Sequence, residues 1–113
     1  MTIETLPREA FRKDQLLREG TWVVGFLADW CPFCRRFRPE LEALDGSTEF
    51  QVGVGDLTSQ ESPLWEDLGI EVVPAVYVFR NGRPVFRAES DLGIGLPPGT
   101  IERARSVARS TLP

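Results

Sequence analysis

The sequence has no histidine and only two cysteines among its 113 residues, and each scarcity excludes a class of protein. Catalysis that relies on a histidine base cannot occur. A structural zinc site needs about four Cys or His ligands, which this chain cannot supply alone. A scaffold held by several disulfides is also impossible, because two cysteines form at most one bridge. What remains is a local, reversible pair formed by Cys31 and Cys34.

Long apolar runs and an excess of positive charge are also lacking. The longest apolar stretches, Trp22–Ala28 and Val72–Phe79, are far shorter than the ~20 residues that span a bilayer. Met1–Pro7 has neither the basic start nor the apolar core of a signal peptide. The net charge of −4 argues against nucleic acid as a partner, because phosphate binding needs a basic face. We therefore expect a cytoplasmic protein that binds neither membranes nor nucleic acid.

The length and composition suit a single domain over residues 1–113, because 42% hydrophobic residues can fill one modest core. Apolar spacing and turn residues predict helices at Arg8–Glu19, at Cys34–Leu44, from Ser62-Pro63 to Gly69, and from Pro98 or Gly99 to Thr111. Apolar and β-branched runs predict strands at Thr21–Ala28, Phe50–Val54, Val72–Phe79 and Val85–Ala88. A further N-terminal strand around Ile3 fits the pattern as well.

The order of these elements predicts an α/β protein, because strands that alternate with helices form a parallel sheet. The pair Asn81-Gly82 is a strong hairpin signal, and its second strand adds an antiparallel edge. Pro39 should kink the second helix, since it removes a backbone donor. Asp45-Gly46 should end that helix.

Cys31 and Cys34 are predicted to lie where a buried strand ends and a helix begins. The first N–H groups of a helix have no partner within it, and the positive end of the helix dipole lies there. Both effects stabilise a thiolate, which is the reactive form of cysteine. We expect Cys31, at the turn, to be exposed and nucleophilic. Cys34 should be more buried and should resolve the mixed disulfide that Cys31 forms.

The main alternatives are two ordinary buried thiols or a purely structural bridge. A bridge that closes so short a loop would stabilise little through loop entropy. The redox interpretation is favoured by a strand before the motif, a helix after it, Trp30 directly before Cys31, and no other cysteine in the chain.

Several motifs in order resemble the thioredoxin family. The segment Phe26–Cys34, with sequence FLADWCPFC, is similar to the strand end and W-C-x-x-C active site of that family. Pro39, five residues after Cys34, matches the proline that kinks the family's second helix. Gly69–Ala75 and Val76–Gly82 resemble the segment that carries the family's cis-proline, strand and hairpin. The resemblance is strong over about residues 21–86 and loose outside them.

This resemblance implies a thioredoxin fold, in which a central mixed sheet of four to five strands is flanked by helices on both faces. It also implies a monomeric thiol–disulfide oxidoreductase without metal or other cofactor. Its partners would be protein disulfide substrates and an electron donor of the thioredoxin-reductase type.

The resemblance also implies roles for individual residues, with Cys31 and Cys34 as the catalytic pair. The residues matched to substrate binding are Trp30, Pro32, Phe33, Val73 and Pro74. A proline early in a buried strand fits a cis bond, a bulge or an edge, and a cis bond at Pro74 would leave the backbone of Val73 free to pair with an extended peptide. The loop around Ser90–Ile94 matches the family's substrate-facing surface.

Two departures from the family pattern bear on the chemistry. The buried aspartate usual six residues before the first active cysteine is Gly25 here, and its lysine partner on the next strand is Val54. Without that acid we expect slow resolution near neutral pH, or proton transfer through water or another carboxylate such as Asp29. The dipeptide Pro32-Phe33 replaces the typical Gly-Pro and is closer to the Pro-Tyr of glutaredoxins. We expect this change to raise the reduction potential above that of a standard thioredoxin.

These departures leave three other functions open. Pro32-Phe33 slightly favours a glutathione-linked, glutaredoxin-like reductase, whereas Trp30, the first helix and the total length favour a thioredoxin. The absence of the Asp/Lys pair favours a binding module that docks a partner with little turnover. A dimer that holds one metal ion or cluster between two cysteine pairs is compatible with Pro32 and has no other support.

Overall fold

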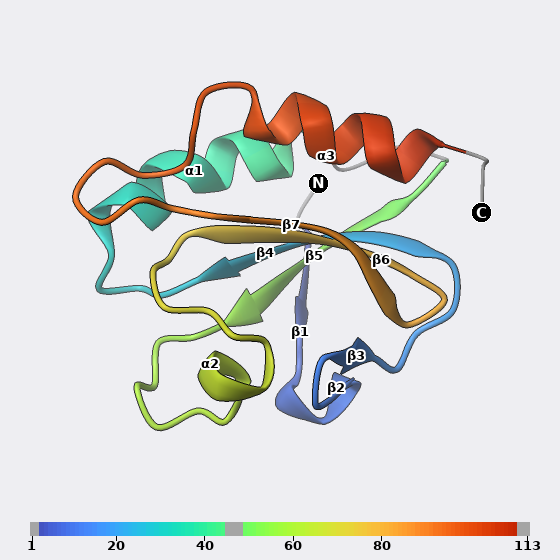
Figure 1. Ribbon diagram of the computed structural model, residues 1–113, viewed down its shortest axis with the longest axis horizontal. Helices are drawn as coiled ribbons and strands as arrows, with labels where there is room; N and C mark the ends of the chain where they lie inside the picture. Colours follow the sequence, from blue (N-terminus) through green and yellow to red (C-terminus); the bar gives the residue numbers. More distant parts are fainter. Residues whose placement is uncertain (1–2, 45–48, 111–113) are drawn as a thin grey trace.

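The computed structural model describes residues 3–44 and 49–110 and is built on a five-stranded sheet (Figure 1). The strand order across the sheet is β1-β5-β4-β6-β7. Strands β1 and β4 both pair parallel with β5, whereas β6 is antiparallel to β4 and β7 is antiparallel to β6. The strands are β1 (Glu4–Leu6), β4 (Thr21–Leu27), β5 (Gln51–Asp56), β6 (Ala75–Arg80) and β7 (Arg83–Glu89). The sheet is therefore mixed, as expected, and the N-terminal strand predicted around Ile3 is confirmed.

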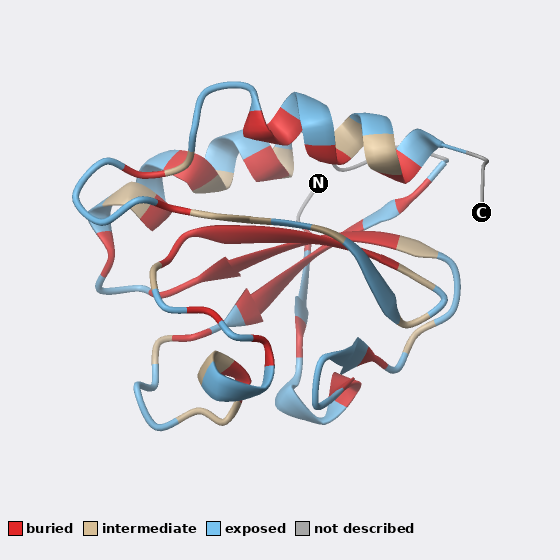
Figure 2. Ribbon diagram, viewed as in Figure 1, coloured by how far each residue is buried: buried red, intermediate tan, exposed pale blue. Residues whose placement is uncertain are grey.

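The described residues form three α-helices, α1 (Pro32–Glu42), α2 (Leu64–Asp67) and α3 (Thr100–Arg109). Helices α1 and α3 lie on one face of the sheet, and α2 lies on the other face (Figure 1). The inner face of α1 carries the buried residues Cys34, Phe37 and Leu41. Burial is concentrated in β4, β5 and β6 and on the sides of α1 and α3 that face them (Figure 2). The Cys31–Cys34 segment thus lies at the start of a helix that packs on the core.

The helix predicted over Arg8–Glu19 is wrong. This segment forms a short 3-10 turn (Arg8–Ala10) followed by a small hairpin of β2 (Phe11–Arg12) and β3 (Gln15–Leu16). Phe11 is buried, with its ring centroid 5.6 Å from that of Phe26, and the Leu16 N–H donates to the Gly82 carbonyl at 3.0 Å. Lys13 turns the chain with a left-handed φ of 56°. Tertiary contacts therefore override the helix-end signals of Pro7 and Gly20.

Several predicted boundaries also move. Helix α1 begins at Pro32 instead of Cys34, because proline is favoured at the first helical position. Strand β6 begins at Ala75 instead of Val72, directly after the cis peptide bond between Val73 and Pro74. Helix α2 begins later than predicted, because its N-cap is Pro63 and its first residue is Leu64; the Oγ of Ser62, just before the cap, accepts the N–H of Leu64 at 3.3 Å. The helix ends predicted at Asp45-Gly46 and at Thr111 lie outside the described residues.

The hairpin predicted at Asn81-Gly82 is confirmed. Asn81 and Gly82 have φ of 50° and 90°, the left-handed values that a tight β-hairpin turn requires. Asn81 also bonds Gly20 twice, because its N–H donates to the Gly20 carbonyl and its Oδ1 accepts the Gly20 N–H, both at 2.9 Å. Pro39 lies inside α1, and the kink expected there stays a prediction. None of the helices in the described ranges is both long and apolar enough to cross a membrane.

Candidate active site

Cys31 occupies the N-cap of α1, immediately before the first helical residue. Its backbone is extended, and its Sγ accepts the N–H of Cys34 at 3.2 Å. That N–H is one of the helix-start donors that lack a partner within the helix. Pro32 takes the next position, where a missing N–H does no harm. The sulfur of Cys31 thus lies at the positive end of α1, as the sequence predicts.

Cys34 lies one turn into α1 and is 2% exposed, against 5% for Cys31. Its Sγ accepts the N–H of Ala28 at 3.5 Å. Burial, followed by the hydrogen bond with Cys31, raises the pKa of the Cys34 thiol from 9.0 to about 12, while the Ala28 N–H acts in the opposite direction. Cys34 is therefore a protonated thiol at neutral pH.

The expectation that Cys31 is exposed is wrong. Its thiol points toward the segment before β6 and donates to the Val73 carbonyl at 3.6 Å, instead of extending into solvent. Both cysteines are free thiols in this structure. A disulfide that Cys31 attacks must therefore approach its sulfur alongside Val73.

The Val73–Pro74 peptide bond is cis, as the resemblance implies. Among the described residues, no hydrogen bond to the Val73 N–H is present. The Pro74 carbonyl accepts the hydroxyl of Ser90 at 2.6 Å, and both residues are buried. Ser90 therefore positions the proline, a role that the sequence did not indicate, instead of lying on the substrate-facing surface predicted for residues 90–94. The exposed residues of that loop are Leu92 and Ile94.

Trp30 is half exposed beside the motif and has a fixed orientation. Its Nε1 donates to the Thr58 carbonyl at 2.8 Å, and its ring stacks on Trp65 with 6.4 Å between centroids. Thr58 lies between β5 and α2, Trp65 lies in α2, and neither was singled out from the sequence. One face of Trp30 is therefore used for packing, and the exposed remainder is free for contact with a partner.

The side chains of the Pro32-Phe33 dipeptide lie on the outer side of the motif. Pro32 is exposed, and Phe33 is partly buried under the Arg36 guanidinium, which is 4.7 Å from the ring centroid. Phe33 also lines a hollow of about 190 Å³ together with Pro74 and Ile94. The structure thus brings Phe33 and Pro74 together, while the effect of the dipeptide on the reduction potential stays a prediction.

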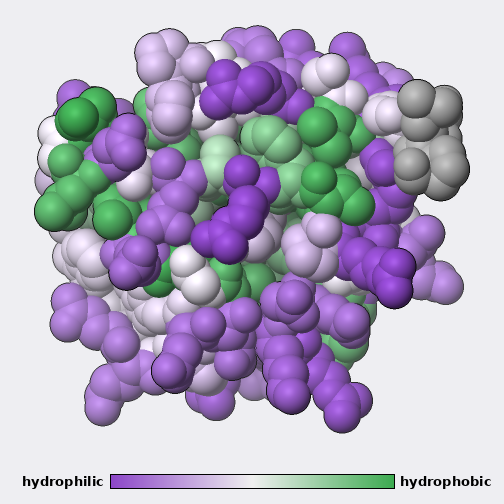
Figure 3. All heavy atoms as spheres, viewed as in Figure 1, coloured by the Kyte–Doolittle hydropathy of each residue, from purple (hydrophilic) through white to green (hydrophobic). Residues whose placement is uncertain are grey.

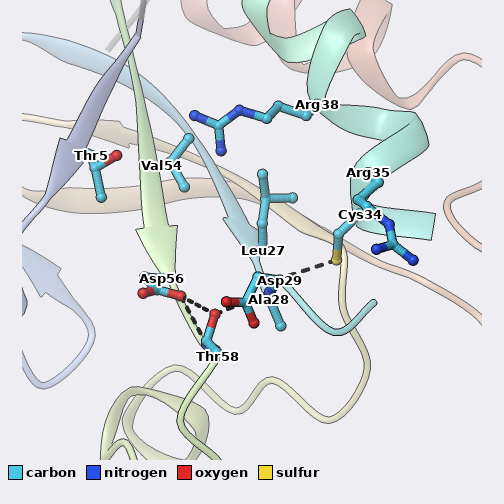
Figure 4. Close-up of a pocket in the computed structure, with 10 residues that line it drawn as sticks. All are labelled: Thr5, Leu27, Ala28, Asp29, Cys34, Arg35, Arg38, Val54, Asp56 and Thr58. Atoms are coloured by element: carbon cyan, nitrogen blue, oxygen red, sulfur yellow. Dashed lines mark hydrogen bonds between the residues drawn. The ribbon is translucent and has the colours of Figure 1, made fainter. Parts of the chain in front are cut away.

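The structure supports the assignment of Gly25 and Val54 to the missing acid–base pair, because the two residues are direct partners across β4 and β5. A Cβ atom on Gly25 would lie 2.5 Å from Cδ2 of Leu41, so this leucine fills the space of the usual carboxyl group. A pocket of about 310 Å³ opens beside Cys34, and Val54 is among the residues that line it (Figure 4). Its charged lining residues are Asp29, Arg35, Arg38 and Asp56.

Comparison with known proteins agrees with this geometry. The family model described as Thioredoxin matches residues 2–93. A thioredoxin from Rhodospirillum rubrum is 31% identical over 66% of this chain and 72% of its own length. One from Synechocystis sp. is 30% identical over 80% of this chain and 81% of its own.

Solved structures show the same fold. The long form of thioredoxin f from spinach chloroplast superposes with a TM-score of 0.75 at 20% identity, covering 96% of this chain and 88% of that one. A thioredoxin from Malassezia sympodialis gives 0.70 at 17% identity, covering 96% and 92%. The mixed sheet with helices on both faces is therefore a thioredoxin fold.

Proposed function

The chain belongs to the thioredoxin family, and on that premise we propose that it reduces or exchanges protein disulfides through a Cys31/Cys34 dithiol–disulfide cycle. The observation that carries the proposal is the position of the two sulfurs at the start of α1. The Cys31 sulfur accepts a helix-start N–H, while burial keeps the Cys34 thiol protonated behind it. The Cys31 sulfur is thereby suited to attack the substrate, and the Cys34 sulfur to resolve the mixed disulfide afterwards.

The cycle has two exchange steps. The Cys31 thiolate attacks one sulfur of a substrate disulfide, the substrate S–S bond breaks, and a substrate thiolate leaves. Cys34 then loses its proton and attacks the Cys31 sulfur. This breaks the mixed disulfide, releases the second substrate thiolate and leaves a Cys31–Cys34 disulfide. The substrate gains two electrons, which a donor of the thioredoxin-reductase type would return to the protein.

Protein substrates fit the surface around Cys31 better than small thiols. Trp30, Leu92 and Ile94 are exposed apolar side chains, and Ile94 shares a hollow with Phe33 and Pro74. Hydrophobic side chains gather at the end of the molecule where this loop lies (Figure 3). An extended peptide could add hydrogen bonds to the backbone of Val73. We place the protein in the cytoplasm as a monomer that binds substrate with Trp30, Pro32, Phe33, Val73 and Pro74.

A second candidate is a binding module with little turnover. The observation that favours it is the replacement of the buried acid–base pair by Gly25 and Val54, since slow deprotonation of Cys34 would leave partners attached to Cys31. A third candidate is a glutathione-linked reductase, which the glutaredoxin-like Pro32-Phe33 dipeptide favours.

Insulin reduction by dithiothreitol separates these functions. We expect the protein to accelerate precipitation of the insulin B chain, and Cys31→Ser to abolish the acceleration. Equal rates for the two proteins would favour the binding module. Recovery of the dithiol with NADPH and thioredoxin reductase, but not with glutathione and its reductase, would identify the donor. The Cys34→Ser variant should accumulate a mixed disulfide at Cys31, which can be captured and identified.

A further inference from the structure

Cys34 must lose its proton before it can attack the mixed disulfide. The buried aspartate that usually accepts such a proton is replaced by Gly25 in this chain. Burial holds the Cys34 thiol protonated at neutral pH. Gly25 has no side chain to accept the proton, and Leu41 fills the space that a carboxyl group there would need. An acceptor must therefore reach Cys34 from another element.

The pocket beside Cys34 offers such a route. It has a volume of about 310 Å³, ample for water molecules that can carry a proton. Cys34 lies on one wall and Asp56, the last residue of β5, on another (Figure 4). Asp56 and Val54 project from the same face of β5, because side chains two residues apart in a strand share a face. Asp56 therefore lies on the side of the sheet where the missing acid–base pair would have been.

Hydrogen bonds tie Asp56 to the loop that contacts the Cys34 sulfur. Oδ1 of Asp56 accepts both the N–H of Thr58, at 2.9 Å, and its hydroxyl, at 2.6 Å. The Thr58 Oγ in turn accepts the N–H of Asp29 at 3.0 Å. The preceding N–H in the chain, that of Ala28, donates to Cys34 Sγ. Asp56 is thus oriented by Thr58, which is in turn bonded to the loop that holds the sulfur.

Asp29 also lines the pocket and is the nearest rival. Within the described residues, its carboxylate makes no hydrogen bond, and only its backbone N–H joins the network. In Asp56, by contrast, both bonds fall on Oδ1, and Oδ2 has no partner in the described part of the chain. An oriented carboxylate with one open oxygen is the better acceptor.

The other charged groups around Asp56 come from three elements. Arg35 and Arg38 of α1 line the same pocket, and Arg38 is paired with Glu42 at 3.0 Å. Arg8 and Glu61 line a second hollow that Asp56 also borders. The pocket beside Cys34 therefore holds charges of both signs, and Asp56 is the carboxylate there that side-chain hydrogen bonds orient.

We propose that Asp56 is the proton acceptor for Cys34 during resolution, acting through water in this pocket. The inference rests on the proposed disulfide cycle. The Cys34 S–H proton passes to Asp56 as the sulfur attacks Cys31. The Cys31–Cys34 bond forms, the bond from Cys31 to the substrate breaks, and the substrate leaves as a thiolate. Asp56 then releases its proton to solvent.

Stopped-flow reaction of the reduced protein with 5,5′-dithiobis(2-nitrobenzoate) measures both steps. The first thionitrobenzoate is released in a second-order step as Cys31 attacks. The second is released in a first-order step as Cys34 resolves the mixed disulfide. We expect Asp56→Asn to slow the second step at pH 7 by about 10- to 100-fold, within the range of general-base catalysis, and to leave the first unchanged. The deficit should shrink as the pH rises toward 12, because hydroxide then deprotonates Cys34 directly.

Two further variants separate proton transfer from mere support of the loop. Asp29→Asn tests the rival carboxylate. Thr58→Val removes the hydroxyl that donates a hydrogen bond to Asp56, while the Asp56 carboxylate itself is kept. The proposal requires a pH-dependent deficit in Asp56→Asn that is larger than in either. It is overturned if Asp56→Asn resolves as fast as the parent, if Asp29→Asn shows the larger deficit, or if the Asp56→Asn deficit is independent of pH. Absence of the first-order step in the parent would instead overturn the disulfide cycle itself.

Discussion

Cys34 is the residue whose surroundings most affect its chemistry. Its pKa is raised from 9.0 to about 12 by burial, so the folded protein holds the thiol proton more tightly than the unfolded chain does. This contribution to stability is complete below pH 9 and is lost as the pH rises from 9 to 12. We therefore expect the reduced protein to be stabilised relative to Cys34→Ser at pH 8, and this advantage to shrink by pH 11.

Urea denaturation of both reduced proteins at several pH values measures this advantage. Burial also raises the pKa of Tyr77, so its contribution to the free energy of unfolding falls at high pH as well. That contribution is the same in both proteins and cancels in the difference between them. A difference between parent and variant that stays constant from pH 8 to 11 would contradict the assignment.

Gly25 is the second residue whose environment can be tested singly. An added Cβ would meet Leu41, which is fully buried and cannot move without disturbing the core. Overpacking of this kind costs about 1–3 kcal/mol, more than the ~0.4–1 kcal/mol that Gly→Ala gains by restricting the unfolded chain. We expect Gly25→Ala to lower the free energy of unfolding by about 1–2 kcal/mol in urea denaturation.

A double-mutant cycle with Leu41→Ala identifies the cause. Because the smaller side chain leaves room for the new methyl group, the double variant should be more stable than the sum of the single effects predicts, by about 1 kcal/mol. Strict additivity would place the strain of Gly25→Ala somewhere other than at Leu41.

Residue-level prediction from the sequence succeeded where a motif fixes spacing and failed where a side chain's direction depends on distant segments. The pairing of Gly25 with Val54 follows from aligning two strands. The burial of Cys31 could not be predicted, because its thiol turns toward Val73, which is far away in the sequence. Asp56 carried no signal either, since a carboxylate at the end of a strand is common.

At the scale of elements, the error over Arg8–Glu19 shows the limit of local signals. A proline, a polar run and a glycine suggested a helix with both ends marked. The segment instead forms a small hairpin, because Phe11 packs on Phe26 and Leu16 bonds the Gly82 carbonyl. The Asn81-Gly82 turn was predicted correctly, since its left-handed backbone is required by the turn itself.

The contact between these two hairpins leads to a paired prediction. Gly82 has a φ of +90°, and an added Cβ would lie 2.8 Å from the backbone oxygen of Leu16. Gly93 has a φ of +77° with open space around it. An alanine at either site costs about 1–2 kcal/mol for the left-handed backbone. Gly82→Ala should cost about 1 kcal/mol more in chemical denaturation, because a backbone oxygen cannot rotate away; equal losses would show that the hairpins can separate freely.

At the scale of the whole molecule, three segments distant in the sequence meet at the Cys31–Cys34 motif. They are the motif at the start of α1, the Val73–Pro74 bond before β6, and the loop after β7 that carries Ile94. The family resemblance predicted the first two as a pair. For the loop, the resemblance predicted only that residues 90–94 face the substrate. It could not show that Ser90 would be buried against Pro74 while Leu92 and Ile94 remain exposed.

This arrangement distinguishes protein substrates from small disulfides. Ile94 is 73% exposed and lies beside Phe33 and Pro74, so a docked protein would bury it, whereas a small disulfide needs only the sulfur. Partial burial of an isoleucine contributes about 1 kcal/mol. We expect Ile94→Ser to raise KM for insulin reduction about 3- to 10-fold and to leave the reaction with 5,5′-dithiobis(2-nitrobenzoate) unchanged. Leu17→Ser is the matched control, because Leu17 is 53% exposed and does not line the hollow that Ile94 shares with Phe33 and Pro74. Equal effects of the two substitutions on KM would show that the loop after β7 does not contact protein substrates.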